Sequence, residues 1–238
     1  MQLTFNICSW GAWSPYYQQA TDWKNWHSSV THLQEELSRT PKLTQVPAMQ
    51  RRRYSSLTKM QLEAAFQCNA PTPCRSIFAS RHGELHRTIT LLDNLVEQEP
   101  LSPIAFSQSV HNTASGIYSI LKEDQSPSTS IAAGEETLAQ ALIEAYAQLQ
   151  QDPFPLMLVF ADQPVPERYR QFTDEPELPI SMAFTLTQEI AQGATLNITH
   201  GDKSKLPPLS YDALLHGLAN QQAVSGILSK HLWTLSFG

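Results

Sequence analysis

The sequence predicts a layered α/β fold, and three observations support this class. Segments with the two-residue period of strands alternate along the chain with segments of helical period. The run 154–161 is apolar throughout, as expected of a central strand that is covered on both faces. The chain has 238 residues, of which 41% are hydrophobic. This is enough apolar material for one packed core.

The first part of the chain predicts a strand, an irregular segment, and then a helix, a strand and a helix. Residues 2–7 alternate polar and apolar side chains, which is typical of a strand with one buried face. Residues 10–50 carry prolines and four tryptophans, which predicts a long irregular segment with one or two short helices. We expect its aromatic side chains to hold this segment in place by packing. The following elements are a helix from Ser55 to about Asn69, a strand over 76–80 and a helix over 84–96, whose apolar residues Leu85, Ile89, Leu92 and Leu95 have helical spacing.

The second part continues the alternation of helices and strands. Helical patterns cover residues 111–121 and 135–150, and carboxylates stand at the positive N-terminal end of the second helix. Strands are predicted over 129–133, 154–161 and 182–186, with a strand-like pattern at 195–198. Together these elements predict a mixed central sheet flanked by helices.

Charge and cysteine content exclude several classes of protein. Sixteen Lys and Arg residues stand against 22 Asp and Glu, so the net charge is -6, which disfavours nucleic acid as a partner. No apolar run approaches the ~20 residues that span a bilayer, and the N-terminus lacks the pattern of a signal peptide, so we expect a cytoplasmic protein without a membrane partner. Three cysteines without CxxC spacing argue for reduced thiols and against disulfides or a zinc site.

The residues that could carry chemistry give weak signals. His82 and His86 are four apart, but Glu84 does not follow the first histidine directly and no third ligand is marked, so we expect no metal. His200 has no neighbouring nucleophile or orienting group and is interpreted as a surface histidine. GxSxG, P-loop and GxGxxG motifs are absent from the sequence, and we expect no cofactor. The run Arg51, Arg52 and Arg53 fits either a docking patch for an acidic partner or a solvated charge run.

Three stretches of the sequence resemble one known family. They are residues 47–55, residues 80–84 leading into 102–116, and residues 127–135. Together they resemble the N-terminal half of a β-ketoacyl synthase, a thiolase-fold enzyme that condenses acyl chains on acyl carrier protein. The resemblance covers roughly residues 45–190 and implies one truncated domain over 1–238. Its parts would be a Trp-rich segment (1–50), a ketosynthase-like core (51–190) and a divergent C-terminal segment (191–238).

The resemblance implies that this chain lacks the catalytic groups of the family. Active members carry a nucleophilic cysteine at the N-terminus of a buried helix, where the helix dipole lowers the thiol pKa. The register places Glu135 at that position. The sequence also stops before the second half, which holds two catalytic histidines and a lysine in the family. A ketosynthase-like chain of this kind resembles the chain length factors of type II polyketide synthases, and most closely the truncated ones of aryl polyene pigment clusters.

This resemblance also implies a heterodimer with a full-length β-ketoacyl synthase, which itself would hold the acyl carrier protein. In the family, the strand before the nucleophile pairs with its counterpart across the dimer axis, and a neighbouring stretch reaches the acyl pocket of the partner. The implied interface residues here are Thr129, Ser130, Ile131, Ala132, Ala133, Val110, His111, Asn112, Thr113 and Ile117. Arg51, Arg52 and Arg53 are the implied carrier-protein patch. An internal helix packed in the chain's own core is the alternative for residues 110–119.

Two other functions stay open from the sequence. Glu135 is a candidate general acid or base for weak decarboxylation or hydrolysis of malonyl or acyl carrier protein. Alternatively, the chain is a scaffold that binds carrier protein without a ketosynthase partner.

Overall fold

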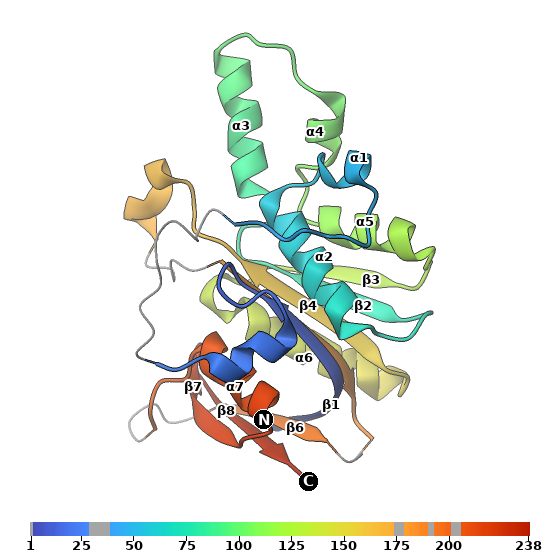
Figure 1. Ribbon diagram of the computed structural model, residues 1–238, viewed down its shortest axis with the longest axis vertical. Helices are drawn as coiled ribbons and strands as arrows, with labels where there is room; N and C mark the ends of the chain where they lie inside the picture. Colours follow the sequence, from blue (N-terminus) through green and yellow to red (C-terminus); the bar gives the residue numbers. More distant parts are fainter. Residues whose placement is uncertain (1, 29–38, 174–178, 190–192, 201–205) are drawn as a thin grey trace.

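One mixed sheet organises the chain (Figure 1). Within residues 2–28, 39–173, 179–189, 193–200 and 206–238, which the computed structural model describes, eight strands follow the order β3-β2-β4-β5-β1-β6-β8-β7. The strands are β1 (Gln2–Trp13), β2 (Arg75–Ala79), β3 (Ser128–Ile131), β4 (Leu156–Asp162), β5 (Ile180–Thr187), β6 (Ala194–His200), β7 (Val224–Leu228) and β8 (His231–Phe237).

The helices connect and cover these strands. The α-helices are α1 (Ala48–Arg51), α2 (Ser56–Cys68), α3 (Leu85–Val96), α4 (Pro103–Ser107), α5 (Thr113–Lys122), α6 (Thr137–Gln151) and α7 (Tyr211–Asn220). Short 3-10 helices are η1 (Ala20–Asn25), η3 (Gly134–Glu136) and η4 (Glu167–Phe172). None of the helices in the described residues combines the length and apolar character needed to cross a membrane.

The predicted α/β class is confirmed. The parallel strands β3, β2 and β4 form one end of the sheet, and the other neighbouring strands pair antiparallel. Every residue of β4 is buried, as its apolar run predicts. The opening strand is longer than its predicted range of 2–7, because β5 supplies antiparallel partners as far as Trp13.

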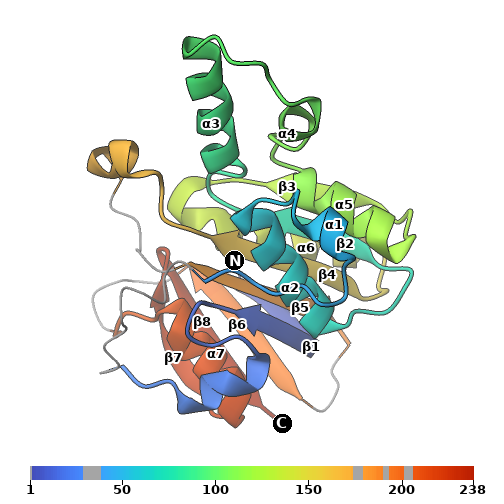
Figure 2. The ribbon, with the colours of Figure 1, turned by 45° about the horizontal axis from the view of Figure 1, so that its top comes forward.

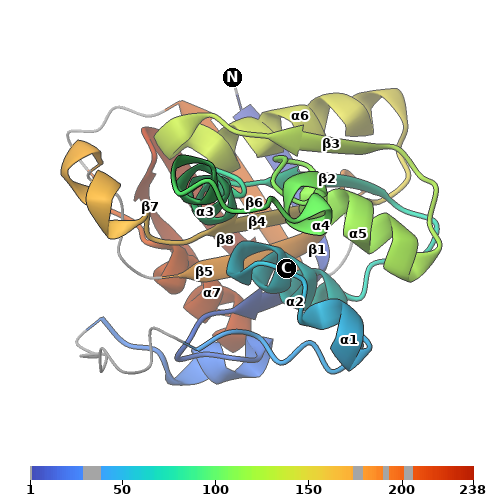
Figure 3. The ribbon, with the colours of Figure 1, turned by 90° about the horizontal axis from the view of Figure 1, so that it is seen from above.

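Helices cover both faces of the parallel end of the sheet (Figure 3). α2 and α5 pack on one face, over Phe78, Met157 and Val159. α6 packs on the opposite face, where Phe5 meets Tyr146 of the helix edge-on at 6.0 Å. α7 lies on the same face as α6, because Phe160 belongs to that core and its ring is 5.1 Å from Tyr211.

The position of α2 depends on both its ends and one glycine. The hydroxyl of Ser55 accepts the N–H of Thr58 at the start, and Asn69 closes the helix in the left-handed conformation. A side chain at Gly11 of β1 would lie 2.4 Å from the carbonyl oxygen of Ala64. Only glycine therefore allows this helix to approach the sheet so closely.

The Trp-rich segment contributes to the core as predicted. Trp13 and Trp23 are buried, and Trp10 and Trp26 pack partly buried against the main core. η1 and α1 are the short helices expected in this region.

Candidate partner interface

The two edge strands of the sheet, β7 and β3, differ in whether another described segment of the chain covers them. At the β7 edge, Leu209 donates its N–H to the carbonyl of Ile227 (2.8 Å), and Ile227 donates its N–H to the carbonyl of Pro207 (2.9 Å). The segment from Pro207 to Leu209 therefore closes this edge, and its two prolines offer no N–H to a further strand.

The β3 edge has no such cover in the described part of the chain. β3 pairs with β2, and Ser76 and Ser80 donate their N–H groups to the carbonyls of Pro127 (3.1 Å) and Ile131 (3.2 Å). In a parallel ladder, alternate residues point their backbone groups to the same neighbour. Ser128 and Ser130 therefore turn their N–H and C=O groups away from β2, toward the space where a further strand would pair.

The side chains of β3 face the chain's own helices. Gln148 of α6 donates to the hydroxyl of Thr129 (3.4 Å), and Ile131 packs against the main core. Successive side chains alternate between faces, so Ser130 points to the α5 side. Its hydroxyl is buried and has no hydrogen-bond partner among the described residues.

The predicted strand 129–133 is too long at its end. Pairing stops at Ile131, opposite Ala79, because β2 ends there. Ala132 and Ala133 are exposed and lead into the turn at Gly134, whose φ of 57° lies in the left-handed region.

Glu135 lies at the start of α6 as predicted, but it is not buried in this chain. It belongs to η3, the 3-10 turn directly before the helix, and it is exposed. The turn lies beyond the end of the edge strand β3. The neighbouring Glu136 forms an ion pair with Lys230 at 3.0 Å, and the hydrogen bond from this lysine lowers the pKa of Glu136.

Residues 110–117, before and within α5, differ in their exposure to solvent. Val110 is about half exposed and Asn112 is exposed. Thr113 is buried in the chain, and Ile117 packs partly buried against the α2–α5 core. Thr113 therefore packs in the chain's own core, and Ile117 does so in part, whereas Val110 and Asn112 are accessible to a partner.

His111 is fixed at the carboxyl end of β2. Its Nε2 lies 3.0 Å from the carbonyl oxygen and 3.3 Å from the hydroxyl of Ser80. A side chain at Gly83 would lie 2.7 Å from the His111 ring, so the glycine makes room for it. The histidine thus connects the start of α5 to the turn that follows β2.

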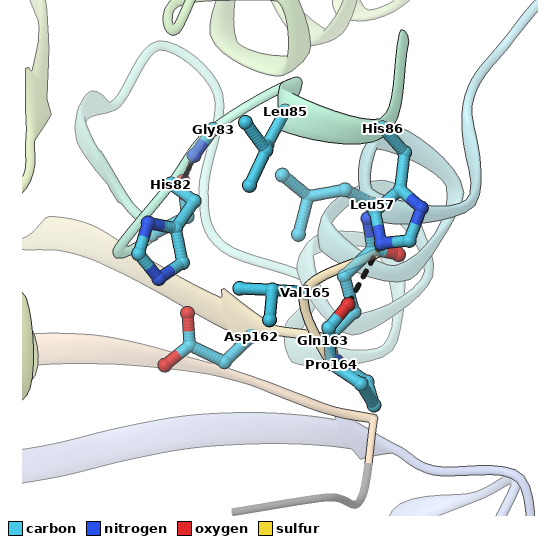
Figure 4. Close-up of a pocket in the computed structure, with 10 residues that line it drawn as sticks. Leu57, His82, Gly83, Leu85, His86, Asp162, Gln163, Pro164 and Val165 are labelled. Carbon is cyan, nitrogen blue, oxygen red and sulfur yellow. Dashed lines mark hydrogen bonds between the residues drawn. The ribbon is translucent and has the colours of Figure 1, made fainter. Parts of the chain in front are cut away.

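A small cleft lies beside this turn (Figure 4). It is lined by residues that include His82, His86, Asp162 and Val165, and its volume of about 10 Å³ admits roughly one water. His86 Nε2 lies 2.7 Å from the carbonyl oxygen of Pro164. No group of three or more His, Cys, Asp or Glu side chains in the described residues is arranged to hold a metal ion. The cleft is too small for an acyl chain.

A buried ion pair joins the two parallel strands next to the cleft. Nε of Arg81 lies 2.6 Å from Asp162, and the backbone N–H of Arg81 also donates to this carboxylate (3.0 Å). This pair was not predicted, although each of its residues directly follows a predicted strand. Parallel strands bring such residues together at their carboxyl ends.

The three arginines at positions 51–53 have different surroundings. The guanidinium of Arg51 donates to the carbonyls of Lys42 (3.2 Å) and Leu43 (3.3 Å), which gives it a structural role. Arg52 and Arg53 are exposed. The surface charge available to an acidic partner is therefore that of Arg52 and Arg53.

The cysteines occupy positions that do not favour a thiolate. Burial raises the pKa of Cys74 to about 11 and also raises the pKa of Cys68, which lies near the C-terminal end of α2. Cys8 is exposed on β1, and its pKa is raised as well by partial desolvation. His200, interpreted as a surface histidine, is exposed.

One apolar helix face is partly exposed. Of the apolar residues predicted to share a face of the helix over 84–96, Ile89 is buried, but Leu92 and Leu95 are about half exposed. Helical spacing shows that such residues share a face, but it does not show which chain covers them. This surface was missed as a candidate interface.

The comparison with known proteins agrees with this fold and these motifs. The family model of the β-ketoacyl synthase N-terminal domain matches residues 23–232, a longer stretch than the 45–190 that the motifs indicate. A chain in the structure of a ketosynthase (ApeO) in complex with its chain length factor (ApeC) from Xenorhabdus doucetiae is 28% identical, with a TM-score of 0.78. The similarity covers 98% of this chain and 99% of that chain.

More distant structures share the fold. The ishigamide ketosynthase/chain length factor has a TM-score of 0.66 at 15% identity, over 82% of this chain and 66% of that chain. A β-ketoacyl synthase from Burkholderia phymatum STM815 has a TM-score of 0.54 at 12% identity, over 91% and 69%. No curated protein matches the sequence. Because the family model of the β-ketoacyl synthase N-terminal domain matches most of this chain, the chain belongs to the β-ketoacyl synthase family through that domain.

Proposed function

We propose that this chain is a non-catalytic subunit that pairs with a complete β-ketoacyl synthase, as a chain length factor does, and shapes the pocket in which the partner's acyl chain grows. The observation that carries the proposal is the difference between the two sheet edges. The chain closes its β7 edge with its own residues, whereas Ser128 and Ser130 of β3 present backbone groups outward. An open edge of this kind is a template for a strand of another chain.

The similarity to the ketosynthase complex from Xenorhabdus doucetiae supports a ketosynthase as that other chain. The two chains compared match over nearly their whole lengths. The product of the complex would be of the aryl polyene or a related polyketide type.

The residues at the family's nucleophile position support a non-catalytic role. Glu135 replaces the cysteine and is exposed to water, and the buried Cys68 and Cys74 have raised pKa values. A carboxylate in an exposed turn is a poor acyl carrier. Acyl transfer is therefore assigned to the partner, and Arg52 and Arg53 would at most add to the binding of carrier protein.

A pair of substitutions at Ser130 tests the pairing. Ser130→Pro removes an N–H that faces away from β2, so the internal ladder is kept while a partner strand loses a hydrogen bond and meets the proline ring. Ser130→Ala keeps the N–H and removes a hydroxyl that has no hydrogen-bond partner among the described residues. We expect the proline variant to bind the co-expressed ketosynthase at least tenfold more weakly than wild type, and the alanine variant to bind normally.

Circular dichroism of both purified variants shows first that they are folded. Equal binding by folded Ser130→Pro and Ser130→Ala chains would contradict the assignment of β3 as the interface. Ile131→Asp is a poorer test, because the Ile131 side chain packs against the chain's own core and the charge would destabilise the fold itself.

A further inference from the structure

α3 and α4 form an arm that stands beyond the sheet (Figures 1 and 2). Buried Glu84 fixes its base by accepting hydrogen bonds from the hydroxyls of Ser55 (2.7 Å) and Thr58 (2.6 Å). Arg168 fixes its side through two hydrogen bonds to the carboxylate of Asp93 (2.8 and 2.6 Å). The arm is thus held at defined points although little of it packs on the body.

The arm exposes an unusual amount of apolar surface. Val96 is 84% exposed and Phe106 is 65% exposed. The exposed apolar residues of the arm are Leu92, Leu95, Val96, Ile104 and Phe106. Single exposed apolar residues are normal on a monomer, but five of them on two neighbouring helices are typical of an interaction surface.

The arm begins where the β3 edge ends. The N–H of Ser80, four residues before Glu84, donates to the carbonyl of Ile131, the last residue of β3. Val110, about half exposed, lies between α4 and α5 and extends the apolar surface toward the sheet. A partner strand on β3 would therefore lie close to the base of the arm.

The area that a stable heterodimer needs exceeds what β3 can supply. Specific complexes bury about 800 Å² on each partner. An edge strand of four residues provides only a fraction of this area. Of the twelve large apolar residues that are exposed in the described part of the chain, five lie on the arm, so the arm can supply much of the rest.

We propose that the α3–α4 arm is a second contact with the ketosynthase, which covers the five apolar residues with an apolar surface of its own. This inference rests on the proposed function. Glu97 and Glu99 are exposed just beyond the end of α3. The contacted surface of the partner is therefore apolar with a rim of Lys or Arg, which would complement these carboxylates.

A triple variant with a matched control tests the arm. Leu92→Gln, Leu95→Gln and Val96→Gln together make the outer face of α3 polar and keep residues that favour a helix. The control replaces Met49 and Phe154 by Gln, since each is 74% exposed and lies outside the arm. We expect the triple variant to bind the purified ketosynthase at least tenfold more weakly in a biosensor assay, and the control to bind within twofold of wild type.

Hydrogen exchange of the wild-type chain gives a second measurement that does not depend on the variants. Amides of α3 and α4 should become protected when the ketosynthase is added. Binding of the triple variant within twofold of wild type, or unchanged exchange of the arm in the complex, would overturn the inference while leaving the β3 interface intact. A wild-type chain that dimerises with itself through the arm, and whose dimer the triple variant abolishes, would also overturn it. Failure of the wild-type chain to bind the ketosynthase at all would instead contradict the proposed function.

Discussion

Arg81 and Asp162 join the ends of β2 and β4 through an ion pair with a distance of 2.6 Å and nearly buried side chains. Arg168 and Asp93 form a pair at the same distance of 2.6 Å, but their side chains are about half exposed. The two pairs have the same chemistry and differ mainly in their access to water. They should therefore contribute very differently to stability.

Asp162→Ala should lower the free energy of unfolding by about 3–5 kcal/mol, because it removes the carboxylate that balances the charge of buried Arg81. Asp93→Ala should leave the unfolding midpoint nearly unchanged, since solvent screens the exposed pair. Urea unfolding of both variants at neutral pH measures the difference. Equal losses of stability would show that burial does not decide the contribution of these pairs.

Asp212 should make stability depend on pH. Burial raises its pKa from 3.8 to about 6, in the first turn of α7. Between these two values the folded chain keeps a proton that the unfolded chain has released, so stability falls as the pH rises from about 4 to 6 and then stays level. The loss is at most about 3 kcal/mol for a shift of this size.

Asp212→Asn should therefore stabilise the chain at pH 7 and have little effect at pH 4. The measurement is the difference in unfolding free energy between variant and wild type at several pH values, which cancels the contributions of other carboxylates. A difference that does not change between pH 4 and 7 would contradict the shifted pKa.

Much of the fold could be predicted because local patterns determine it. The buried run of β4 and the amphipathic α6 were found at nearly their observed bounds. β8 was not predicted, although its alternating pattern around the buried Trp233 and Leu235 would have indicated a strand. The order of the strands could not be derived from periodicity, because it depends on pairing between distant segments such as β1 and β6.

The candidate site was only partly predictable. The register placed Glu135 at the start of α6, but its exposure depends on which segments cover the turn. The stripe that includes Leu92 and Leu95 was visible in the sequence as residues with helical spacing, but periodicity does not distinguish the chain's own core from a surface that a partner covers. Side-chain pairs between strands, such as Arg81 and Asp162, cannot be predicted until the order of the strands is known.

Val110→Trp tests the pocket-shaping part of the proposed function. Val110 is about half exposed, so a larger side chain is accommodated without loss of the chain's own core. In the complex we expect the ring to occupy space at the partner's acyl pocket and to shorten the products, with Val110→Ile as the conservative control. Mass spectrometry of the products at equal binding affinity measures this. Unchanged product lengths from a complex that contains the Trp variant would contradict the role of residue 110.

Glu135→Cys should not convert the chain into a condensing enzyme. Residue 135 lies in an exposed turn, where a thioester would be open to hydrolysis. The N–H of Ala133 is donated to the hydroxyl of Thr137 (2.9 Å) and that of Glu136 to the carbonyl of Ala133 (3.1 Å), so these donors already serve the turn and are not available to an oxyanion.

Glu135→Gln is the matched variant for the alternative in which the carboxylate is a general acid or base. Purified wild-type chain should not turn over malonyl carrier protein, and the Gln variant should support the activity of the ketosynthase within twofold of wild type, because the exposed carboxylate has no chemical step to perform. Mass spectrometry of the carrier protein measures both reactions. If the wild-type chain decarboxylates malonyl carrier protein and Glu135→Gln does not, Glu135 is a catalytic residue. Condensation by Glu135→Cys without a partner would contradict a purely auxiliary role for this chain.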